Sequence, residues 1–334
     1  VDGGYTSKNN NSGKGSGRSE TTLDVEQTGA IAPGANLMVY EGANTNKGLL
    51  DVFTAIATQD KAQVVTCSWG ESELDQSYDA AHSFNNILEE AAAQGQSVFI
   101  AAGDDGAYAD YPLIDTPSVS FPASSPFVTA VGGTTLPENG HIAIPGGSIS
   151  MSGQQGWSWS YLLPYYKNYG YPSEEEFATK VFPVGTGGGS SIYFLKPDYQ
   201  KNSPFDPKTT IGRDVPDVSL NADPLTGYSI YDTNKDSSVG TGWLNGWGGT
   251  SFATPIWAAF TADMDSGLKT PVGFATPTLY QIDAKKEGSQ HPPFSAIQKG
   301  NNWLFYCSGD DNEVTGLGTP HIAALFNDLK NLHA

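Results

Sequence analysis

The sequence predicts an α/β fold, a parallel β-sheet flanked by helices, and three of its segments carry this prediction. Val64–Ser68 and Ser97–Ala102 are short, mostly apolar runs, as expected for parallel strands with both faces buried. Between them, Tyr78–Gln94 has the pattern of a helix, and Gly95 follows it at the position where glycine is favoured. Strand, helix and strand in this order form the right-handed unit of a parallel sheet.

The other segments continue this alternation, and residues 1–334 are expected to form a single domain. Residues 1–18 are polar and glycine-rich and are predicted to be a loop. The aromatic and glycine-rich stretch 138–192 is predicted to form loops and hairpins. Further helices are expected at Ser19–Thr28, Gly48–Gln59 and Ser251–Met264, and further strands at Leu37–Glu41, Phe127–Val131, Asp217–Ser219 and Tyr228–Tyr231.

Composition narrows the class of function. The chain has 36 acidic and 17 basic residues and a formal net charge of −19, which repels nucleic acid and anionic membranes. No run of apolar residues reaches the roughly 18 needed to cross a bilayer. Charged residues are only 16% of the chain, so acid has few ion pairs to break. This suits an acidic environment, although many secreted proteins are simply acidic.

The strongest chemical signal is the run Gly248-Gly249-Thr250-Ser251-Phe252-Ala253-Thr254-Pro255. Small residues precede Ser251, which stands at the start of a strongly apolar helix. A helix N-terminus favours a developing negative charge, and a buried helix holds a nucleophile on a rigid element. The alternative is that Ser251 only caps the helix. We interpret it as a nucleophile.

A serine nucleophile needs a base, and the usual base is histidine. None of the five histidines lies in a glycine-rich loop or at a helix start that would direct it at a nucleophile; they are His82, His141, His291, His321 and His333. Glu20 and Asp24 are four residues apart and project from one face of the first helix. Two carboxyl groups this close can share a proton, although such pairs often mark only a solvated helix face.

Asp104 provides a third acidic group. It follows the predicted strand Ser97–Ala102 within the turn Gly103-Asp104-Asp105-Gly106, at the edge where open α/β sheets bind ligands. In most proteins this would be an ordinary turn residue. A protonated Asp104 could donate a hydrogen bond to an oxyanion.

With these residues in this order, the chain resembles the sedolisin (serine-carboxyl peptidase) family, whose fold is similar to that of subtilisin. The resemblance extends over nearly the whole chain. The matching motifs are Glu20-x-x-Leu23-Asp24, Gly29–Gly34, Ser68-Trp69-Gly70, Gly103-Asp104, Phe121–Ala123, Gly187–Gly189, Val215–Val218, Asn221–Pro224, Gly249–Ser251 and Pro277–Tyr280.

The resemblance assigns roles to individual residues. It implies that Ser251 is the nucleophile, Glu20 its general base, and Asp24 the group that orients Glu20 and shares its proton. It places Asp104 in the oxyanion hole beside the Ser251 N–H. It also implies substrate binding by two segments: Ser68, Trp69 and Gly70 would pair with the substrate main chain, and Gly187 and Gly188 would let it pass closely on the other side.

Two departures from the family are expected. Val1 matches a point inside the family's catalytic domain, so the first βα unit would be missing, and with it a strand whose glutamate supports the catalytic network. We expect that segment to be cleaved but still associated, because its absence would expose a sheet edge.

The second departure concerns calcium. The positions of two family calcium ligands become Ala296 and Asn312, so we predict no metal and no other cofactor. Asp310 and Asp311 could substitute, but the nearby Lys299 argues against it.

The sequence therefore predicts a secreted, extracellular endopeptidase, most active at roughly pH 3–5, that acts on peptides or proteins. Its expected partners are the substrate and its own cleaved N-terminal segment or propeptide, and neither nucleic acid nor membrane. Two alternatives stay open. One is a subtilisin-like peptidase whose histidine comes from the missing segment, and the other is a non-catalytic peptide-binding relative.

Overall fold

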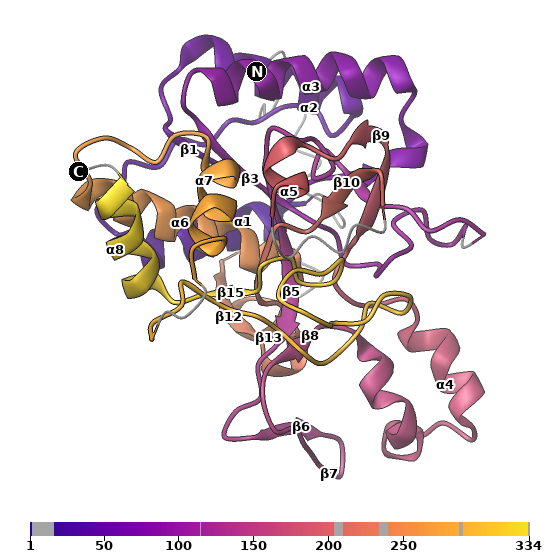
Figure 1. Cartoon of the computed structure of the whole chain (residues 1–334). Helices are drawn as coiled ribbons and strands as arrows, with labels where there is room; N and C mark the ends of the chain where they lie inside the picture. Colours follow the sequence, from indigo (N-terminus) through magenta and orange to yellow (C-terminus); the bar gives the residue numbers. More distant parts are fainter. Residues whose placement is uncertain (2–16, 114, 204–209, 234–239, 287–289, 333–334) are drawn as a thin grey trace.

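A computed structural model describes residues 1, 17–113, 115–203, 210–233, 240–286 and 290–332. Its centre is a parallel sheet in the order β1 (Val64–Cys67), β3 (Ser97–Ala101), β5 (Thr129–Thr135) and β11 (Val218–Asn221). The first three of these strands are labelled in Figure 1. A short strand, β8 (Gln155–Gly156), pairs antiparallel with the end of β5. The parallel α/β fold predicted from the sequence is confirmed.

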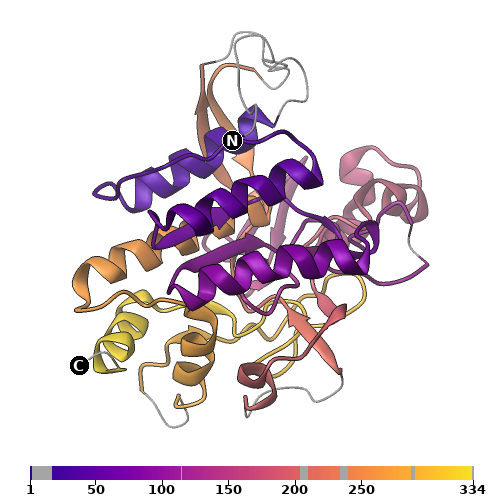
Figure 2. The same ribbon diagram turned by 90° about the horizontal axis from the view of Figure 1, so that it is seen from above.

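Helices cover both faces of the sheet (Figure 2). Helices α2 (Asn46–Gln59) and α3 (Tyr78–Ala93) pack on one face, against a core that includes Val98 and Ile100 of β3. Alternate side chains of a strand point to opposite faces. Phe99 accordingly packs on the other face, against α6 (Thr250–Gly267), α7 (Ala275–Asp283) and α8 (Ile322–Leu332). Helix α1 (Arg18–Ile31) lies along α6.

Smaller elements surround this framework. Five antiparallel pairs are β2 (Glu71–Ser72) with β4 (Ser120–Phe121), β6 (His141–Ile144) with β7 (Gly147–Ser150), β9 (Gly189–Leu195) with β10 (Gly212–Val215), β12 (Tyr228–Asp232) with β13 (Gly242–Trp247), and β14 (Phe294–Ser295) with β15 (Thr319–Pro320). The short helices are η1 (Glu73–Asp75), η2 (Trp159–Tyr169), α4 (Glu174–Val181), α5 (Asp198–Lys201) and η3 (Pro224–Thr226). No helix in the described ranges combines the length and apolar character that crossing a membrane requires.

Most of the predicted elements are present, with ends that shift by a few residues. Two predictions are wrong. Leu37–Glu41 is not a strand, because no strand of the described residues lies beside it to complete a hydrogen-bonded ladder. The stretch 138–192 contains the helices η2 and α4 as well as hairpins. The predicted loop at 1–18 lies mostly outside the described residues.

The helices η2 and α4 form because aromatic residues give them a core of their own. Phe177 of α4 stacks on Tyr169 of η2, within a cluster that also contains Leu162. Ser173 caps α4 by accepting a hydrogen bond from the Glu176 N–H at 3.2 Å. This serine followed three residues later by a glutamate is the pattern of a helix start.

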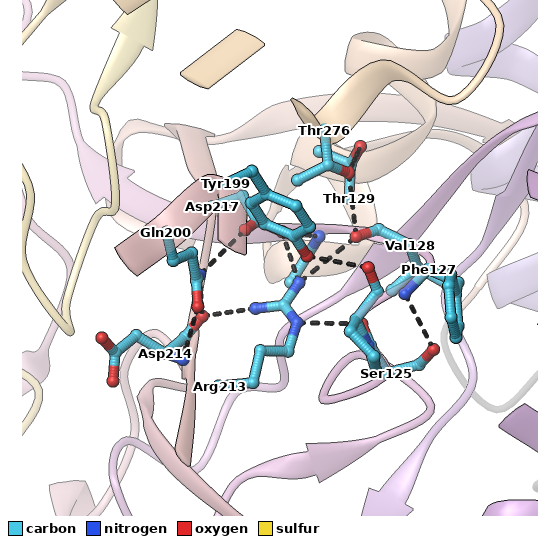
Figure 3. Close-up of polar contacts among 12 residues, drawn as sticks. Ser125, Phe127, Val128, Thr129, Tyr199, Gln200, Arg213, Asp214, Asp217 and Thr276 are labelled. Atoms are coloured by element: carbon cyan, nitrogen blue, oxygen red, sulfur yellow. Dashed lines mark hydrogen bonds and ion pairs between the residues drawn. The ribbon is translucent and has the colours of Figure 1, made fainter. Parts of the chain in front are cut away.

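A buried ion pair joins the hairpin β9–β10 to the sheet (Figure 3). Arg213 and Asp217 are both fully buried, and Arg213 Nη2 donates to Asp217 Oδ2 at 2.5 Å. Arg213 also donates from Nε to the Ser125 carbonyl at 2.8 Å, and Asp217 accepts from the Ala130 N–H at 2.7 Å. Gln200 donates to the second oxygen of Asp217 at 3.3 Å. Each charge therefore has several partners.

We predict that Asp217→Ala lowers the free energy of unfolding by about 3–5 kcal/mol, because it leaves a guanidinium buried without its counter-charge. The matched control is Asp198→Ala, which breaks the Lys201–Asp198 pair, whose side chains are 53% and 88% exposed. This control should cost at most about 1 kcal/mol. Urea unfolding of both variants measures the difference, and equal losses would contradict the prediction.

Candidate active site

Three elements of the fold meet at the carboxyl edge of the sheet. Glu20 and Asp24 lie on successive turns of α1, Asp104 follows β3, and Ser251 is the second residue of α6. Helix α1 is held against α6 by Leu23, which is buried with Phe252 in a small core. This packing turns the acidic face of α1 toward the start of α6.

Gly249 and Pro255 shape the backbone at the start of α6. Gly249 has a φ of +107°, and a Cβ at this position would lie 2.5 Å from Asp104 Oδ2, so a larger residue would clash. Pro255 has no N–H and cannot donate to the carbonyl four residues earlier, which belongs to Ser251. The Ser68 hydroxyl lies 3.3 Å from this carbonyl oxygen.

Glu20 lies beside the Ser251 hydroxyl. Burial raises the pKa of Glu20 to about 7, hydrogen bonding to Ser251 opposes the shift, and the negative charge of Asp104 adds to it. Oε1 of Glu20 is buried and accepts no hydrogen bond within the described part of the chain. The carboxyl group thus has an open acceptor position and keeps its proton more readily than an exposed glutamate does.

Asp24 is held by Ser68, the residue that follows β1. The Ser68 hydroxyl donates to Asp24 Oδ1 at 2.6 Å. Burial raises the pKa of Asp24 to about 8, although this hydrogen bond lowers it, and the nearby charge of Glu20 raises it further. The two carboxyl groups of α1 are therefore electrostatically coupled, and their titration belongs to the pair.

Asp104 is fixed by the residue before the serine. Its Oδ1 accepts two hydrogen bonds from Thr250, at 2.8 Å from the backbone N–H and at 2.9 Å from the hydroxyl. The Gly103 N–H donates to the same hydroxyl oxygen at 3.1 Å. Burial raises the pKa of Asp104, the two bonds from Thr250 oppose the shift, and Asp105 reinforces it. Both bonds use Oδ1, so a proton on this group belongs on Oδ2.

The structure thus brings together Ser251, Glu20, Asp24 and Asp104, as the sequence predicts. The assignment of Ser68, Trp69 and Gly70 to substrate binding remains a prediction. Trp69 is partly buried against the core beside α2 and α3, and Gly70 is exposed next to the Phe121 carbonyl. Their pairing with substrate is untested.

Close packing against the protein's own backbone leaves no room for a side chain at Gly187 or Gly188. A Cβ at Gly187 would lie 1.9 Å from the Ala102 carbonyl oxygen, and one at Gly188 would lie 2.1 Å from the Glu313 carbonyl oxygen. The Gly187 N–H also donates to the Gly103 carbonyl at 2.7 Å. Close packing on the protein's own backbone therefore accounts for both, and their contact with substrate stays a prediction.

Two contacts within the candidate site were missed at the level of sequence. Thr250 anchors Asp104, and Ser68 binds Asp24 as well as standing in the segment predicted to contact substrate. A threonine directly before the serine and a proline four residues after it were the available signals. They could not show which distant groups these residues meet.

The described histidines lie away from this cluster. His82 stacks on Tyr78 in α3, and the His321 ring contacts the Ser295 hydroxyl at 2.7 Å. His141 lies in the hairpin β6–β7, and His291 precedes β14. His333 is outside the described residues. Carboxyl groups are thus the titratable side chains that the described fold places beside Ser251.

The sequence pattern described as Subtilase family (Peptidase_S8) matches residues 5–278. The chain belongs to this family. Among curated proteins, the subtilase is 34% identical to kumamolisin of Bacillus sp. (strain MN-32) over 90% of its own length and 49% of the relative's. It is 31% identical to sedolisin of Pseudomonas sp. (strain 101), over 86% of its own length and 44% of the relative's. The chain spans about half the length of the curated relatives it matches.

A solved structure agrees with this placement of the subtilase. The fold matches Pseudomonas sedolisin, a serine-carboxyl proteinase complexed with two molecules of pseudo-iodotyrostatin, with a TM-score of 0.75 and 29% identity. The match covers 95% of this chain and 80% of that chain. The resemblance to the sedolisin family and the subtilisin-like fold class are both confirmed.

The family's calcium site does not fit the residues of this subtilase. Oδ1 of Asn312 is engaged by the N–H groups of Val314 and Thr315, each at 3.0 Å, so it caps its own loop. Ala296 has no oxygen in its side chain. Lys299 points its ammonium at the Ser152 hydroxyl at 3.1 Å. Among the described residues, no group of three or more histidine, cysteine or acidic side chains is placed to hold a metal ion.

We predict that calcium contributes little to the stability of this subtilase. Adding EDTA should leave the Tm within about 1 °C, whereas losing a ligand present at 100 times its Kd would remove about 2.7 kcal/mol of stability. Thermal unfolding with EDTA, and again with excess calcium, measures this. A large fall in Tm that calcium reverses would contradict the prediction.

The raised pKa values make a second prediction, about stability and pH. Glu20 and Asp24 bind protons more tightly in the folded than in the unfolded state. The stability that their protonation contributes is therefore fully present below about pH 4 and is lost as the pH rises toward 7–8. We expect the free energy of unfolding to fall by at least about 2 kcal/mol across this range.

Glu20→Gln removes one titrating group and should make this fall clearly shallower. Glu138→Gln, at the turn between β5 and β6, is the control and should leave it unchanged. Urea unfolding at several pH values measures all three proteins. Parallel pH profiles for the wild type and Glu20→Gln would show that the pair titrates as exposed groups do.

Proposed function

We propose that this subtilase is an acid-active, secreted endopeptidase that cleaves peptide bonds with Ser251 as its nucleophile. The observation that carries the proposal is the convergence of three partly buried carboxyl groups, whose pKa values are all raised by desolvation, at the N-terminus of α6 where Ser251 lies. None of the three forms an ion pair with a described residue. A site that only bound peptides would have no need for such an arrangement.

In the proposed reaction, the Ser251 hydroxyl oxygen attacks the carbonyl carbon of the substrate while its proton passes to Glu20. Asp24 shares that proton and keeps Glu20 oriented. The carbonyl oxygen becomes an oxyanion, which accepts hydrogen bonds from protonated Asp104 and the Ser251 N–H. The proton then moves from Glu20 to the leaving amine, the C–N bond breaks, and an acyl-enzyme remains. Glu20 then takes a proton from a water molecule that attacks the ester, and it returns this proton to the Ser251 oxygen as the C–O bond breaks and the acid product leaves.

The proposal sets requirements on protonation. Asp104 must carry a proton, and the pair Glu20–Asp24 must have lost one. Activity should follow a bell whose limbs belong to this coupled system. Because the pKa of Glu20 is raised to about 7, we expect the maximum on the acid side of neutrality but above the pH 3–5 predicted from sequence. The low content of charged residues suits an acidic, extracellular location.

The histidine alternative is less well supported. A histidine supplied by another segment would need a place beside Ser251 that Glu20 already occupies. It would also give a maximum at neutral or alkaline pH. Turnover of one peptide between pH 2 and pH 9 separates the two, and a maximum above pH 8 would favour histidine.

Ser251→Ala tests the nucleophile. We predict a loss of about 10⁴-fold or more in kcat with nearly unchanged peptide affinity, since the substitution removes only the attacking oxygen. Peptide cleavage is followed by mass spectrometry, and the Kd by calorimetry. Ser266→Ala, at the far end of α6, is the control and should keep full turnover. A wild-type protein that binds peptides but never cleaves them would instead support the non-catalytic alternative.

Thr250 tests the oxyanion group through its positioning. Thr250→Val keeps the shape and removes the hydroxyl that donates to Asp104 Oδ1. We predict that kcat falls about 10²–10³-fold with little change in KM, because Asp104 loses its orientation. Thr250→Ser should stay within a few-fold of wild type.

The same hydrogen bond opposes the rise in the pKa of Asp104. This pKa should therefore be higher in Thr250→Val than in the wild type, and close to the wild-type value in Thr250→Ser. NMR of ¹³C-labelled aspartate in a Ser251→Ala background measures it without turnover. If valine left both the Asp104 pKa and kcat unchanged, Thr250 would have no part in positioning.

A further inference from the structure

The turn that carries Asp104 is held in place by a neighbouring stretch of backbone. The Gly187 N–H donates to the Gly103 carbonyl at 2.7 Å, and the Gly185 N–H donates to the Asp104 carbonyl at 2.9 Å. The Gly106 N–H donates in the other direction, to the Gly185 carbonyl at 3.0 Å. Because main-chain hydrogen bonds join the turn to this stretch, the position of Asp104 depends on it.

Two tryptophans anchor Val184, which directly precedes this stretch. The Val184 carbonyl oxygen accepts one hydrogen bond from the backbone N–H of Trp159, at the start of η2, at 2.9 Å. It accepts another from Nε1 of Trp303, in the loop between β14 and β15, also at 2.9 Å. A carbonyl oxygen has two lone pairs, and both are used here. Because Val184 is bonded to Gly185, these contacts also fix the stretch that holds the turn.

Trp303 also lies directly against the turn. A Cβ at Gly106 would lie 3.1 Å from Trp303 Cδ1 and 2.6 Å from the Asn302 carbonyl oxygen. That carbonyl accepts from the Ala107 N–H at 3.0 Å. On its other side the Trp303 ring packs edge-on against Phe182, with 5.1 Å between the ring centroids. Trp303 therefore supports the turn both by direct contact and through Val184.

The backbone of Trp303 is strained, with a φ of +76°. The other non-glycine residues with positive φ in the described part of the chain are Asp60 and Asn139, whose residue types tolerate this region. A bulky aromatic residue does so only where its surroundings impose it, and such strain clusters at functional sites. Here the Trp303 N–H donates to Asn301 Oδ1 at 2.9 Å, which holds the conformation.

We propose that Trp303 is a positioning residue for the oxyanion group. Its indole N–H holds Val184 and its ring lies against Gly106, and together these contacts keep the Asp104 carboxyl group where its Oδ2 can donate to the substrate. This role rests on the proposed peptidase function. Trp303 acts through the turn, not on the reacting atoms.

Displacing the turn should weaken the hydrogen bonds that Asp104 Oδ1 accepts from Thr250. Those bonds oppose the rise in the pKa of Asp104, so their loss should raise this pKa further. The charged groups that face Asp104 are Asp105 on the same turn and Glu20 on α1, and a change at Trp303 leaves both in place. The titration of Asp104 therefore reports the position of the turn.

Trp303→Phe tests this role, because phenylalanine keeps an aromatic ring and removes the N–H donor. In the Ser251→Ala protein, NMR of ¹³C-labelled aspartate should show Asp104 titrating at a pH at least about 0.5 higher with Trp303→Phe than without it. In the active protein, the same substitution should lower kcat about tenfold or more and leave KM within about twofold, because a misplaced donor weakens mainly the transition state.

Tyr199→Phe is the matched control. It also removes an aromatic donor to a main-chain carbonyl, that of Pro126 at 2.8 Å, from a partly buried side chain in α5. It should lower the Tm about as much as Trp303→Phe does, but leave kcat and the titration of Asp104 unchanged. The proposal requires both changes in Trp303→Phe. Either change alone, or equal changes in Tyr199→Phe, would overturn it.

Phe182→Leu is a second variant, in case Trp303→Phe does not fold. It removes the ring that packs on Trp303 and should produce both changes at smaller size, and no change in either would overturn the proposal. If the wild-type protein cleaves no peptide at any pH, the proposed function fails. The titration of Asp104 in the Ser251→Ala protein would still decide whether Trp303 fixes the turn, because it needs no turnover.

Discussion

The candidate active site depends on one electrostatic constraint: three partly buried carboxyl groups lie close together, and none of them forms an ion pair with a described residue. They cannot all be ionised, because each negative charge raises the free energy of the next. The number of protons they hold therefore sets the state of the site. Protonation neutralises the negative charge at this site, whereas Asp217 elsewhere in the fold is neutralised by its ion pair with Arg213. Acid is thus the condition under which the folded site is electrostatically most stable.

Much of the fold and the four central residues could be predicted from sequence, since their signals are local. The buried strands β1 and β3 are short apolar runs, and α6 follows a run of small residues with a serine at the helix start. Glu20 and Asp24 have helical spacing. Each of these patterns is set by neighbours within a few turns of the chain, and the resemblance to a known family indicated the roles that the local patterns alone leave open.

The remaining features depend on contacts between distant segments. Leu37–Glu41 has the composition of a strand, but a strand also needs a neighbour, and no strand of the described residues lies beside this segment. Thr250 and Ser68 are unremarkable residues until the fold brings them to Asp104 and Asp24. The helix α4 was a different kind of error. Its capping serine, Ser173, was present in the sequence but obscured by the glycines and aromatic residues around it.

The proline in α6 has a consequence for the hydroxyl of Ser68. Because Pro255 leaves the Ser251 carbonyl without its helical donor, Ser68 has two acceptors within reach, this carbonyl and Asp24. A hydroxyl has only one hydrogen to give. While Asp24 is ionised, that hydrogen belongs to the carboxylate. Once Asp24 takes up a proton, the Ser68 hydroxyl can rotate to the carbonyl, so that the hydrogen bonding of the Ser251 peptide group depends on the charge of the pair Glu20–Asp24.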